Sequence, residues 1–162
     1  MIVVSDTSPI SNLATVGQLD LLKQIYGEVI IPETVYQEII NAGATEPATL
    51  AVQSLEWIKK GSVNNLTLVM SLQAKLDPGE AEAIVLALEL KADLLIVDER
   101  KGRKQATQLG LKITGTLGVL LKAKQLGVIS SIKPILDDLI NSGFWVSSDI
   151  YQQVLALVGE GE

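Results

Sequence analysis

The sequence predicts a single α/β domain in which a parallel sheet lies between helices. The chain has 162 residues, a length that suits one domain and can bury a sizeable core without disulfides or a structural metal. Short aliphatic runs alternate with longer helix-like stretches, which indicates βαβ crossovers. Three of the runs are nearly continuous in aliphatic residues, as expected for strands covered on both faces.

The individual elements follow from these runs and from the residues that bound them. Strands are expected at 2–4, 29–31, 94–97 and 111–113, and a fifth run at 66–69 fits a strand less clearly. Helices are expected at 32–43, 80–91, 102–109, 117–126, 132–142 and 149–158, several of them opened by Pro or closed by Gly. Segments 41–49 and 61–65 are expected as a loop and a turn. The single domain 1–162 then consists of an α/β core over about 1–128 and a C-terminal helical extension over 129–162.

Composition excludes several classes of chemistry. The chain has no Cys and no His, which removes thiolate and imidazole zinc sites, thiol nucleophiles and histidine bases. Acid–base or metal chemistry therefore falls to carboxylates, Lys or Tyr. The formal net charge of −6 gives no overall basic footprint for nucleic acid, although a local basic patch is compatible with it. With no Cys, no signal-peptide pattern and no long apolar span, we expect a cytoplasmic protein without a membrane partner.

Two acidic residues stand where strands are expected to end. Asp6 closely follows the run 2–4, and Asp98 follows the run 94–97. Ligands of open parallel sheets bind beyond the carboxyl ends of the strands, so the two carboxylates can converge on one crevice. Ser8, directly before Pro9, is the favoured helix cap and leaves Asp6 without a structural task. Asp98 taken alone is more simply a solvated loop acid.

Glutamates on two expected helices add to the set. On a 3.6-residue period, Glu38 flanks the apolar stripe of its helix, and for Glu38 alone a position that reaches solvent is the simpler interpretation. Glu80 and Glu82 lie at the start of the most apolar helix. Asp77 and Glu80 have the spacing of a capping box, a role that fits Glu80 as well as a functional one does.

The acids gain meaning as a group. Carboxylates in one crevice repel each other by roughly 4 kcal/mol per close pair at an effective dielectric near 20, which protonation or bound cations offset. Carboxylates without His or Cys suit hard ions such as Mg²⁺ or Mn²⁺. Both arginines of the chain, Arg100 and Arg103, lie just after Asp98 in a basic segment that includes Lys104. Arginine suits phosphate recognition, and a solvated basic helix face is the plainer alternative.

Other features carry less weight. The glycines of 110–116 have P-loop spacing but lack the Lys that follows the second Gly, so a P-loop is rejected. The turn at 115–118 could offer N–H groups to a phosphate, and close packing explains it as well. Phe144, Trp145 and Tyr151 are expected in the C-terminal core or in an oligomer contact rather than as a base-stacking platform.

Taken together, the motifs resemble those of the PIN-domain nucleases. The chain is similar to a prokaryotic branch that opens with Ser-Asp-Thr-Ser-Pro-x-x-Asn-Leu, which is residues 5–13 here. The pattern continues with Gly-Glu-Ala-Glu-Ala-Ile at 79–84, Leu-Ile-Val-Asp-Glu-Arg at 95–100 and Gly-Leu-x-Ile-Thr-Gly-Thr-Leu-Gly at 110–118. The resemblance covers nearly the whole chain, and only the combination of motifs is specific.

The resemblance implies a PIN-like, Rossmann-like three-layer α/β/α fold with a central, mostly parallel sheet. It also implies an acidic cluster that binds Mg²⁺ or Mn²⁺. The family's acidic positions fall on Asp6, Glu38, Glu80 and Asp98, with Glu82 as a further candidate metal ligand. Many PIN domains carry Asp at the third of these positions, where this chain has Glu80.

The activity implied by the resemblance is metal-assisted hydrolysis of RNA phosphodiester bonds. Asp6 and Asp98 would ligate metal directly, and Glu38 and Glu80 directly or through water. Phosphates would be positioned by basic and hydroxyl residues, namely Ser8, Arg100, Arg103, Lys104 and Thr116. Relatives include the toxin ribonucleases of toxin–antitoxin pairs, so the implied partners are RNA and a cognate antitoxin. A second copy of the chain is also expected as a partner, because the composition implies an apolar surface.

Two other classes stay open on the sequence. An aspartyl-phosphate domain, receiver-like or haloacid-dehalogenase-like, would use Asp6 as nucleophile, but the second acid that such sites need is not at Ser8 or beside Asp6. A non-catalytic PIN-like module would keep the acidic pocket as a vestige and use its apolar C-terminal helices to bind a partner.

Overall fold

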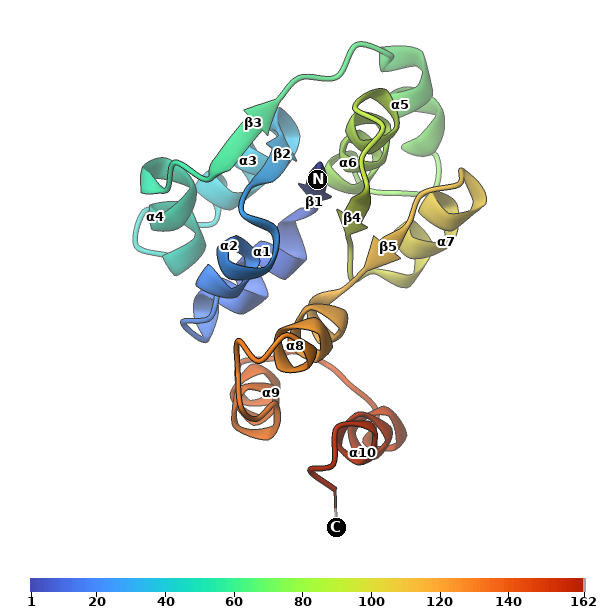
Figure 1. Cartoon of the computed structure of the whole chain (residues 1–162). Coiled ribbons are helices and arrows are strands. Elements are labelled where there is room, and N and C mark those ends of the chain that lie inside the picture. Colours follow the sequence, from blue (N-terminus) through green and yellow to red (C-terminus); the bar gives the residue numbers. More distant parts are fainter. Residues whose placement is uncertain (162) are drawn as a thin grey trace.

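The computed structural model describes residues 1–161 and shows an α/β fold around a five-stranded sheet whose pairings are all parallel (Figure 1). The strands are β1 (Val3–Ser5), β2 (Val29–Pro32), β3 (Ile58–Gly61), β4 (Leu94–Ile96) and β5 (Ile113–Thr114). Their order is β3-β2-β1-β4-β5. The chain therefore builds outward from β1 in one direction and then returns to β1's other side with β4. This reversal places the topological switch point between β1 and β4. Open sheets bind ligands at the carboxyl ends of the strands at such a point.

Helices cover both faces of the sheet. In the described residues they are α1 (Thr7–Thr15), α2 (Asp20–Tyr26), α3 (Glu33–Asn41), α4 (Pro47–Ser54), α5 (Leu66–Leu72), α6 (Pro78–Glu89), α7 (Arg100–Gln108), α8 (Thr116–Gln125), α9 (Lys133–Asn141) and α10 (Ser148–Leu157). Within residues 1–161, no helix has both the length and the apolar character needed to cross a bilayer.

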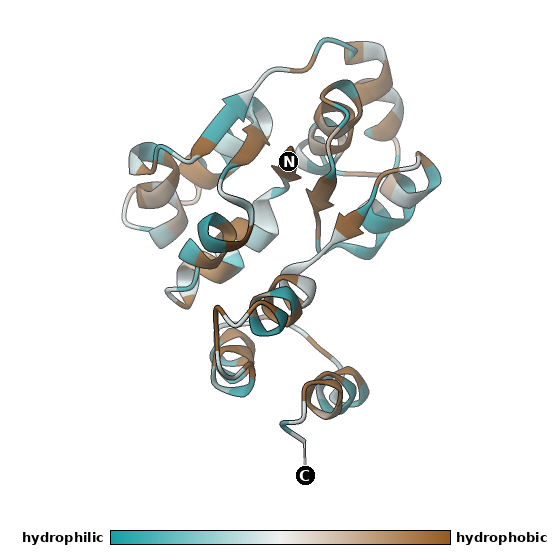
Figure 2. Cartoon of the chain, viewed as in Figure 1, coloured by the Kyte–Doolittle hydropathy of each residue, from teal (hydrophilic) through white to brown (hydrophobic). Residues whose placement is uncertain are grey.

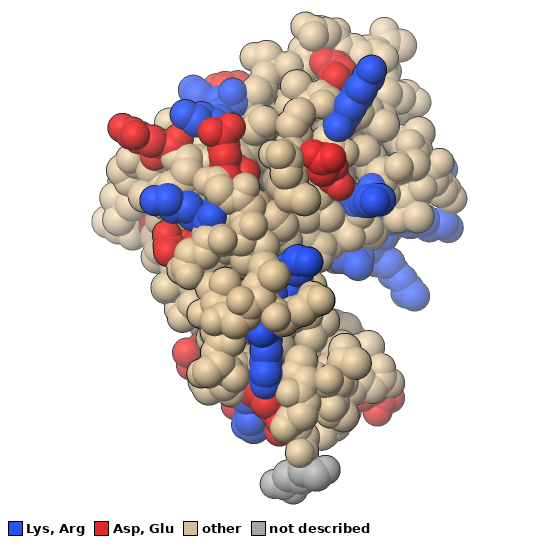
Figure 3. Space-filling view, viewed as in Figure 1, with Lys and Arg blue, Asp and Glu red and all other residues tan. Residues whose placement is uncertain are grey.

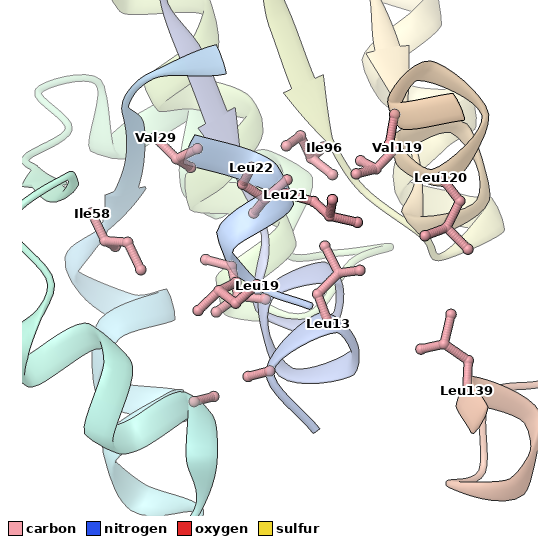
Figure 4. Close-up of a cluster of buried hydrophobic side chains, with 14 of the residues drawn as sticks. Leu13, Leu19, Leu21, Leu22, Val29, Ile58, Ile96, Val119, Leu120 and Leu139 are labelled. Atoms are coloured by element: carbon pink, nitrogen blue, oxygen red, sulfur yellow. The ribbon is translucent and has the colours of Figure 1, made fainter. Parts of the chain in front are cut away.

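Neighbouring residues of the central strands enter different cores. Val3 and Ile96 belong to a cluster that α1–α4 and α8–α10 close, part of which Figure 4 shows. Val4 and Leu95 belong to a second cluster, closed by α5, α6 and α7. Each central strand is thus buried on both faces, and Figure 2 shows β4 and the first part of β1 as hydrophobic. The predicted three-layer architecture is confirmed.

The expected strand at 66–69 is wrong, because this segment forms helix α5. The Asn65 side chain caps the helix by accepting the Leu68 N–H at 3.0 Å, and Val69 and Leu72 share the buried face. The fifth strand is instead β3, which pairs with β2 at the sheet edge. Only Ile58 of β3 is buried, so the strand has no apolar run to reveal it. Exposed lysines on such an edge also oppose pairing with another chain.

The first half of the chain has more helix than the sequence indicated. Helix α1 begins directly after Asp6, so Asp6 and not Ser8 occupies the N-cap position, and Ser8 lies inside the first turn. The Asp6 side chain makes no capping hydrogen bond there, which leaves its carboxylate free for another role. Helix α2 was not expected, and α4 begins at Pro47, inside the segment expected as a loop.

The C-terminal helices pack onto the same core as the sheet. Leu136 and Leu139 of α9 are buried in the first cluster, and Phe144 and Tyr151 pack against it, as expected of them. Trp145 is not in the core, because 82% of its surface is exposed, so of its two expected places only the oligomer contact stays open. Glu160 closes this region by accepting the Ile132 N–H at the start of α9 at 2.8 Å and a bond from Lys124 Nζ at 2.7 Å.

Replacing Glu160 with Ala is expected to destabilise the chain by about 1–3 kcal/mol, the cost of leaving hydrogen-bond donors unsatisfied. Burial raises the pKa of Glu160, but hydrogen bonds from Ile132, Lys124, Ser131 and Lys133 outweigh it and lower the pKa to about 2. The contribution is therefore present above pH 4.5 and lost as the pH falls toward 2. Urea unfolding at pH 7 and pH 3 measures both effects. An equal loss in the exposed control Glu56→Ala would contradict this role.

Candidate active site

The carboxyl edge of β1 and β4 brings the first and last of the predicted acids to the switch point. The Asp6 N–H donates to the Ile96 carbonyl at 2.9 Å, which continues the β1–β4 ladder by one residue. Asp98 follows β4 two residues later on the neighbouring strand. Asp6 is only 5% exposed, an unusual environment for a carboxylate without a basic partner.

Asp98 is fixed in place by three donors. Its Oδ1 accepts the Thr116 N–H at 2.6 Å, and its Oδ2 accepts the Thr116 hydroxyl at 2.7 Å and Asn12 Nδ2 at 3.2 Å. The carboxylate lies at the N-terminus of α8, where the helix dipole favours negative charge. Gly115 leaves room for it, because a Cβ there would lie 2.7 Å from Asp98 Oδ1. A solvated loop acid, the simpler sequence interpretation of Asp98, is therefore wrong.

Glu80 serves in the predicted capping box and keeps one oxygen unused. The Glu80 N–H donates to Asp77 Oδ1 at 2.8 Å, and Glu80 Oε1 accepts the Asp77 N–H at 3.3 Å. Glu80 Oε2 is the one buried side-chain polar atom in residues 1–161 that has no hydrogen-bond partner. It faces Gly102 of α7, where a Cβ would lie 2.7 Å away. An orphaned buried oxygen is costly, so a ligand that met this atom would remove that cost.

Glu38 reaches the same edge from α3. Its Oε2 accepts the Thr7 hydroxyl at 2.9 Å, and its Oε1 lies against the backbone of Gly79 at the start of α6. Glu38 is exposed, as the sequence suggested, but its carboxylate is held between α1 and α6. Gly79, Gly102 and Gly115 thus each leave space for one of three predicted acids.

Burial and neighbouring acids raise the pKa values of two of the acids. Burial raises the pKa of Asp6 to about 7; the Thr7 amide opposes this rise, and repulsion from Asp77, Glu38 and Asp98 adds to it. Burial likewise raises the pKa of Glu80 to about 7, with repulsion from Asp77 and Asp6. The side chains are therefore close enough to share one electrostatic environment, and perturbed carboxylates in a cleft are typical of functional sites.

The donor set fits a hard divalent cation. Asp6 and Glu80 offer buried carboxylate oxygens, one of them without any partner, and a cation would relieve the repulsion between them. Within residues 1–161, no three acidic side chains are already arranged as ligands of one ion. Mg²⁺ often binds through only one or two carboxylates and keeps several waters, so a pair of protein ligands is sufficient.

Two of the predicted site residues have other partners. Glu82 lies two residues beyond Glu80 on α6, and its carboxylate accepts the Thr34 hydroxyl and, at 3.2 Å, the Thr34 N–H at the start of α3. Glu82 therefore joins α6 to α3, and Thr34 already engages both of its carboxylate oxygens. Thr116 is fully buried, and both of its donors are directed to Asp98. It positions that acid.

The residues expected to position phosphates line two separate hollows. Ser8, Arg100 and Arg103 line a cavity of about 830 Å³, and Asp98 lines it as well. Arg103 Nη1 donates to the Val97 carbonyl at 3.1 Å, which holds its guanidinium at the carboxyl end of β4. Lys104 instead lines a smaller hollow of about 370 Å³ together with Lys75 and Lys101. Figure 3 shows Lys and Arg side chains projecting from the α7 side of the molecule.

Some residues of the site were not singled out in the sequence. Thr7 holds Glu38, and Asn12 holds Asp98, across 31 and 86 residues of chain. Asn12 lies four residues after Ser8 on α1, so the two share a helix face, and both line the larger cavity. In the sequence, the four-residue spacing of Ser8 and Asn12, close behind Asp6, could have indicated that Asn12 belongs to the site.

Comparison with known proteins gives the chain's family. No curated protein matches the sequence. A family model described as DUF3368, PIN domain, matches residues 2–160, nearly the whole chain. The all-parallel α/β fold agrees with that match. The chain therefore belongs to the PIN domain family.

Proposed function

We propose that the chain is a metal-dependent ribonuclease that hydrolyses RNA phosphodiester bonds with its acidic edge. PIN domains are generally nucleases and are typically metal-dependent. The observation that carries the proposal is the buried pair Asp6 and Glu80, with one Glu80 oxygen unsatisfied, at the topological switch point. A role as the toxin of a toxin–antitoxin pair is supported by the similarity of the motifs alone, and pairing with a second copy by the apolar character of the chain.

The residues divide the work of hydrolysis among them. A divalent cation supplies such a site with polarisation of a phosphoryl oxygen and with water of lowered pKa. Asp6 and Glu80 are the residues that would hold it, with Asp98 fixed beside them by Thr116 and Asn12. Since their pKa values lie at about 7, Asp6 and Glu80 lose their protons close to neutral pH. Arg103, tied to the Val97 carbonyl, is placed to hold a phosphate.

Cleavage of a labelled RNA strand tests the proposal. We expect wild type to cut with Mg²⁺ or Mn²⁺ and to be silent with EDTA. Asp6→Asn and Asp98→Asn are expected to lose at least about two orders of magnitude in rate, because each removes a charge on which transition-state stabilisation depends. The matched control is Asp138→Asn, which changes an exposed acid of α9.

The outcomes separate the candidate functions. Activity that persists in Asp6→Asn and Asp98→Asn would identify a contaminant or another site. A folded wild type that cuts no RNA with either metal would contradict the nuclease and favour a PIN-like interaction module. Folding of each variant is checked by circular dichroism and thermal melting.

A further inference from the structure

The cavity beside Asp98 has one wall that the proposed chemistry does not use. On one side lie Ser8, Asp98, Arg100 and Arg103, and on the other lies the segment 143–147 that joins α9 to α10. The volume of about 830 Å³ is within the range of ligand-binding pockets. Figure 3 shows the molecule hollowed between the α7 side and the C-terminal helices. The cavity is thus continuous with the acidic edge at Asp98.

Trp145 is the residue on the far wall that demands an explanation. Its neighbours Phe144 and Val146 are half-buried, whereas Trp145 is 82% exposed and lines the cavity. The chain has six aromatic residues, and Trp145 is the only exposed one within residues 1–161. The positive φ of Gly143, 105°, ends α9 and starts the extended segment that turns Phe144 inward and Trp145 outward.

We infer that Trp145 stacks on an unpaired base of a single-stranded nucleic acid whose phosphates lie against Arg100 and Arg103. This inference rests on the proposed ribonuclease function and adds Trp145 to it as a residue that binds a base rather than a phosphate. The indole and the two guanidinium groups line opposite walls of one cavity, which is the combination of aromatic platform and basic track that binds single strands. A base inside a duplex is paired and stacked on its neighbours, so its face cannot meet an indole.

Electrostatics favours a strand that gains affinity from its bases. The chain carries a net charge of −6 and only two arginines, so backbone attraction alone is weak. The Asp98 carboxylate lines the same cavity and repels a phosphate, which weakens backbone attraction further. Stacking on one aromatic side chain supplies about a tenfold gain in affinity, independent of charge.

Binding of short labelled oligonucleotides in EDTA, where no cleavage occurs, tests the inference by fluorescence anisotropy. We expect Trp145→Ala to bind single-stranded RNA about tenfold more weakly than wild type, and Trp145→Phe to retain most of the affinity. An abasic strand with the same phosphates, and a duplex of the same sequence, are expected to bind wild type and Trp145→Ala equally. Met70→Ala removes another largely exposed apolar side chain, from α5, and serves as the matched control.

A second measurement uses the fluorescence of the indole itself. The chain has two tryptophans, so in a Trp57→Phe background the emission reports on Trp145 alone. We expect the base-bearing strand to quench it and the abasic strand not to.

Equal binding by wild type and Trp145→Ala overturns the inference while leaving the nuclease intact if RNA is still cut. The inference is also overturned if Trp145→Ala dissociates a dimer and leaves RNA binding unchanged, because the indole is then a contact between two copies of the chain. A wild type that neither binds nor cuts RNA removes the proposed function as well.

Discussion

Asp6→Asn is expected to stabilise the metal-free protein at pH 8 by up to roughly 4 kcal/mol, while it abolishes cleavage. Asp6 is 5% exposed, and burial with repulsion from Asp77, Glu38 and Asp98 raises its pKa from 3.8 to about 7. The ionised side chain therefore opposes folding at pH 8. Asn has the same shape without the charge and is as favourable as Asp at an N-cap, so the fold is retained.

The pH dependence of stability follows from the same shift. Because the pKa of Asp6 is higher in the folded chain, the folded state holds a proton between pH 3.8 and about 7 that the unfolded state has released. The contribution of Asp6 to the free energy of unfolding is therefore largest below about pH 4 and is lost as the pH rises through 7. The raised pKa of Glu80 acts in the same direction. Asp6→Asn is expected to flatten this fall, as measured by urea unfolding from pH 5 to pH 8 in EDTA.

Metal provides the complementary measurement. Millimolar Mn²⁺ is expected to raise the melting temperature of wild type and not that of Asp6→Asn, because only the wild-type carboxylate pair gains from a bound cation. Asp138→Asn, on the exposed side of α9, is expected to follow wild type in both respects. If Asp6→Asn is less stable than wild type at pH 8 without metal, the Asp6 carboxylate has a structural partner. The conclusion that its charge opposes folding is then ruled out.

The fold could be predicted from the sequence where a buried strand appears as a continuous run of aliphatic residues. Strands β1, β2 and β4 are buried on both faces and read as aliphatic runs, so their positions agree with the expectation. Strand β3 is held by backbone pairing with β2, and backbone pairing leaves no trace in the side chains Lys59 and Lys60. Helix α5 shows the converse, since four apolar or β-branched residues in a row, 66–69, fit either element until the Asn65 cap decides.

The acidic residues of the site could be predicted from the sequence, but the residues that hydrogen-bond to them could not. Asp6 and Asp98 follow strands, and Asp77 with Glu80 has the spacing of a capping box, so position in the sequence indicated where they lie. Which partner each acid takes depends on contacts between distant segments. Asn12 reaches Asp98 across 86 residues, and Thr34 binds the Glu82 carboxylate across 48 residues. The exposure of Trp145 likewise depends on the packing of α9 and α10.

Gly102→Ala is expected to destabilise the protein by about 1–3 kcal/mol and to abolish cleavage, although Ala ordinarily stabilises a helical position. Gly102 lies in the first turn of α7 and is buried, and a Cβ there would stand 2.7 Å from Glu80 Oε2 and 3.2 Å from Val97 Cγ2. The added methyl group would therefore push Glu80 out of the space it occupies beside Asp6. The loss of cleavage would follow from this displacement, because Gly102 has no functional group of its own.

A double-mutant cycle with Glu80→Ala isolates that contact. Glu80→Ala removes the oxygen that the new Cβ would meet, whereas the contact with Val97 stays the same in both backgrounds and cancels. In the Glu80→Ala background we expect Gly102→Ala to be neutral or to stabilise by about 0.5–1 kcal/mol, as at an ordinary helical site. Urea unfolding of the four proteins then gives a coupling energy of about 1 kcal/mol or more. Additive effects would mean that the clash lies with Val97, and that α7 does not shape the space around the Glu80 carboxylate.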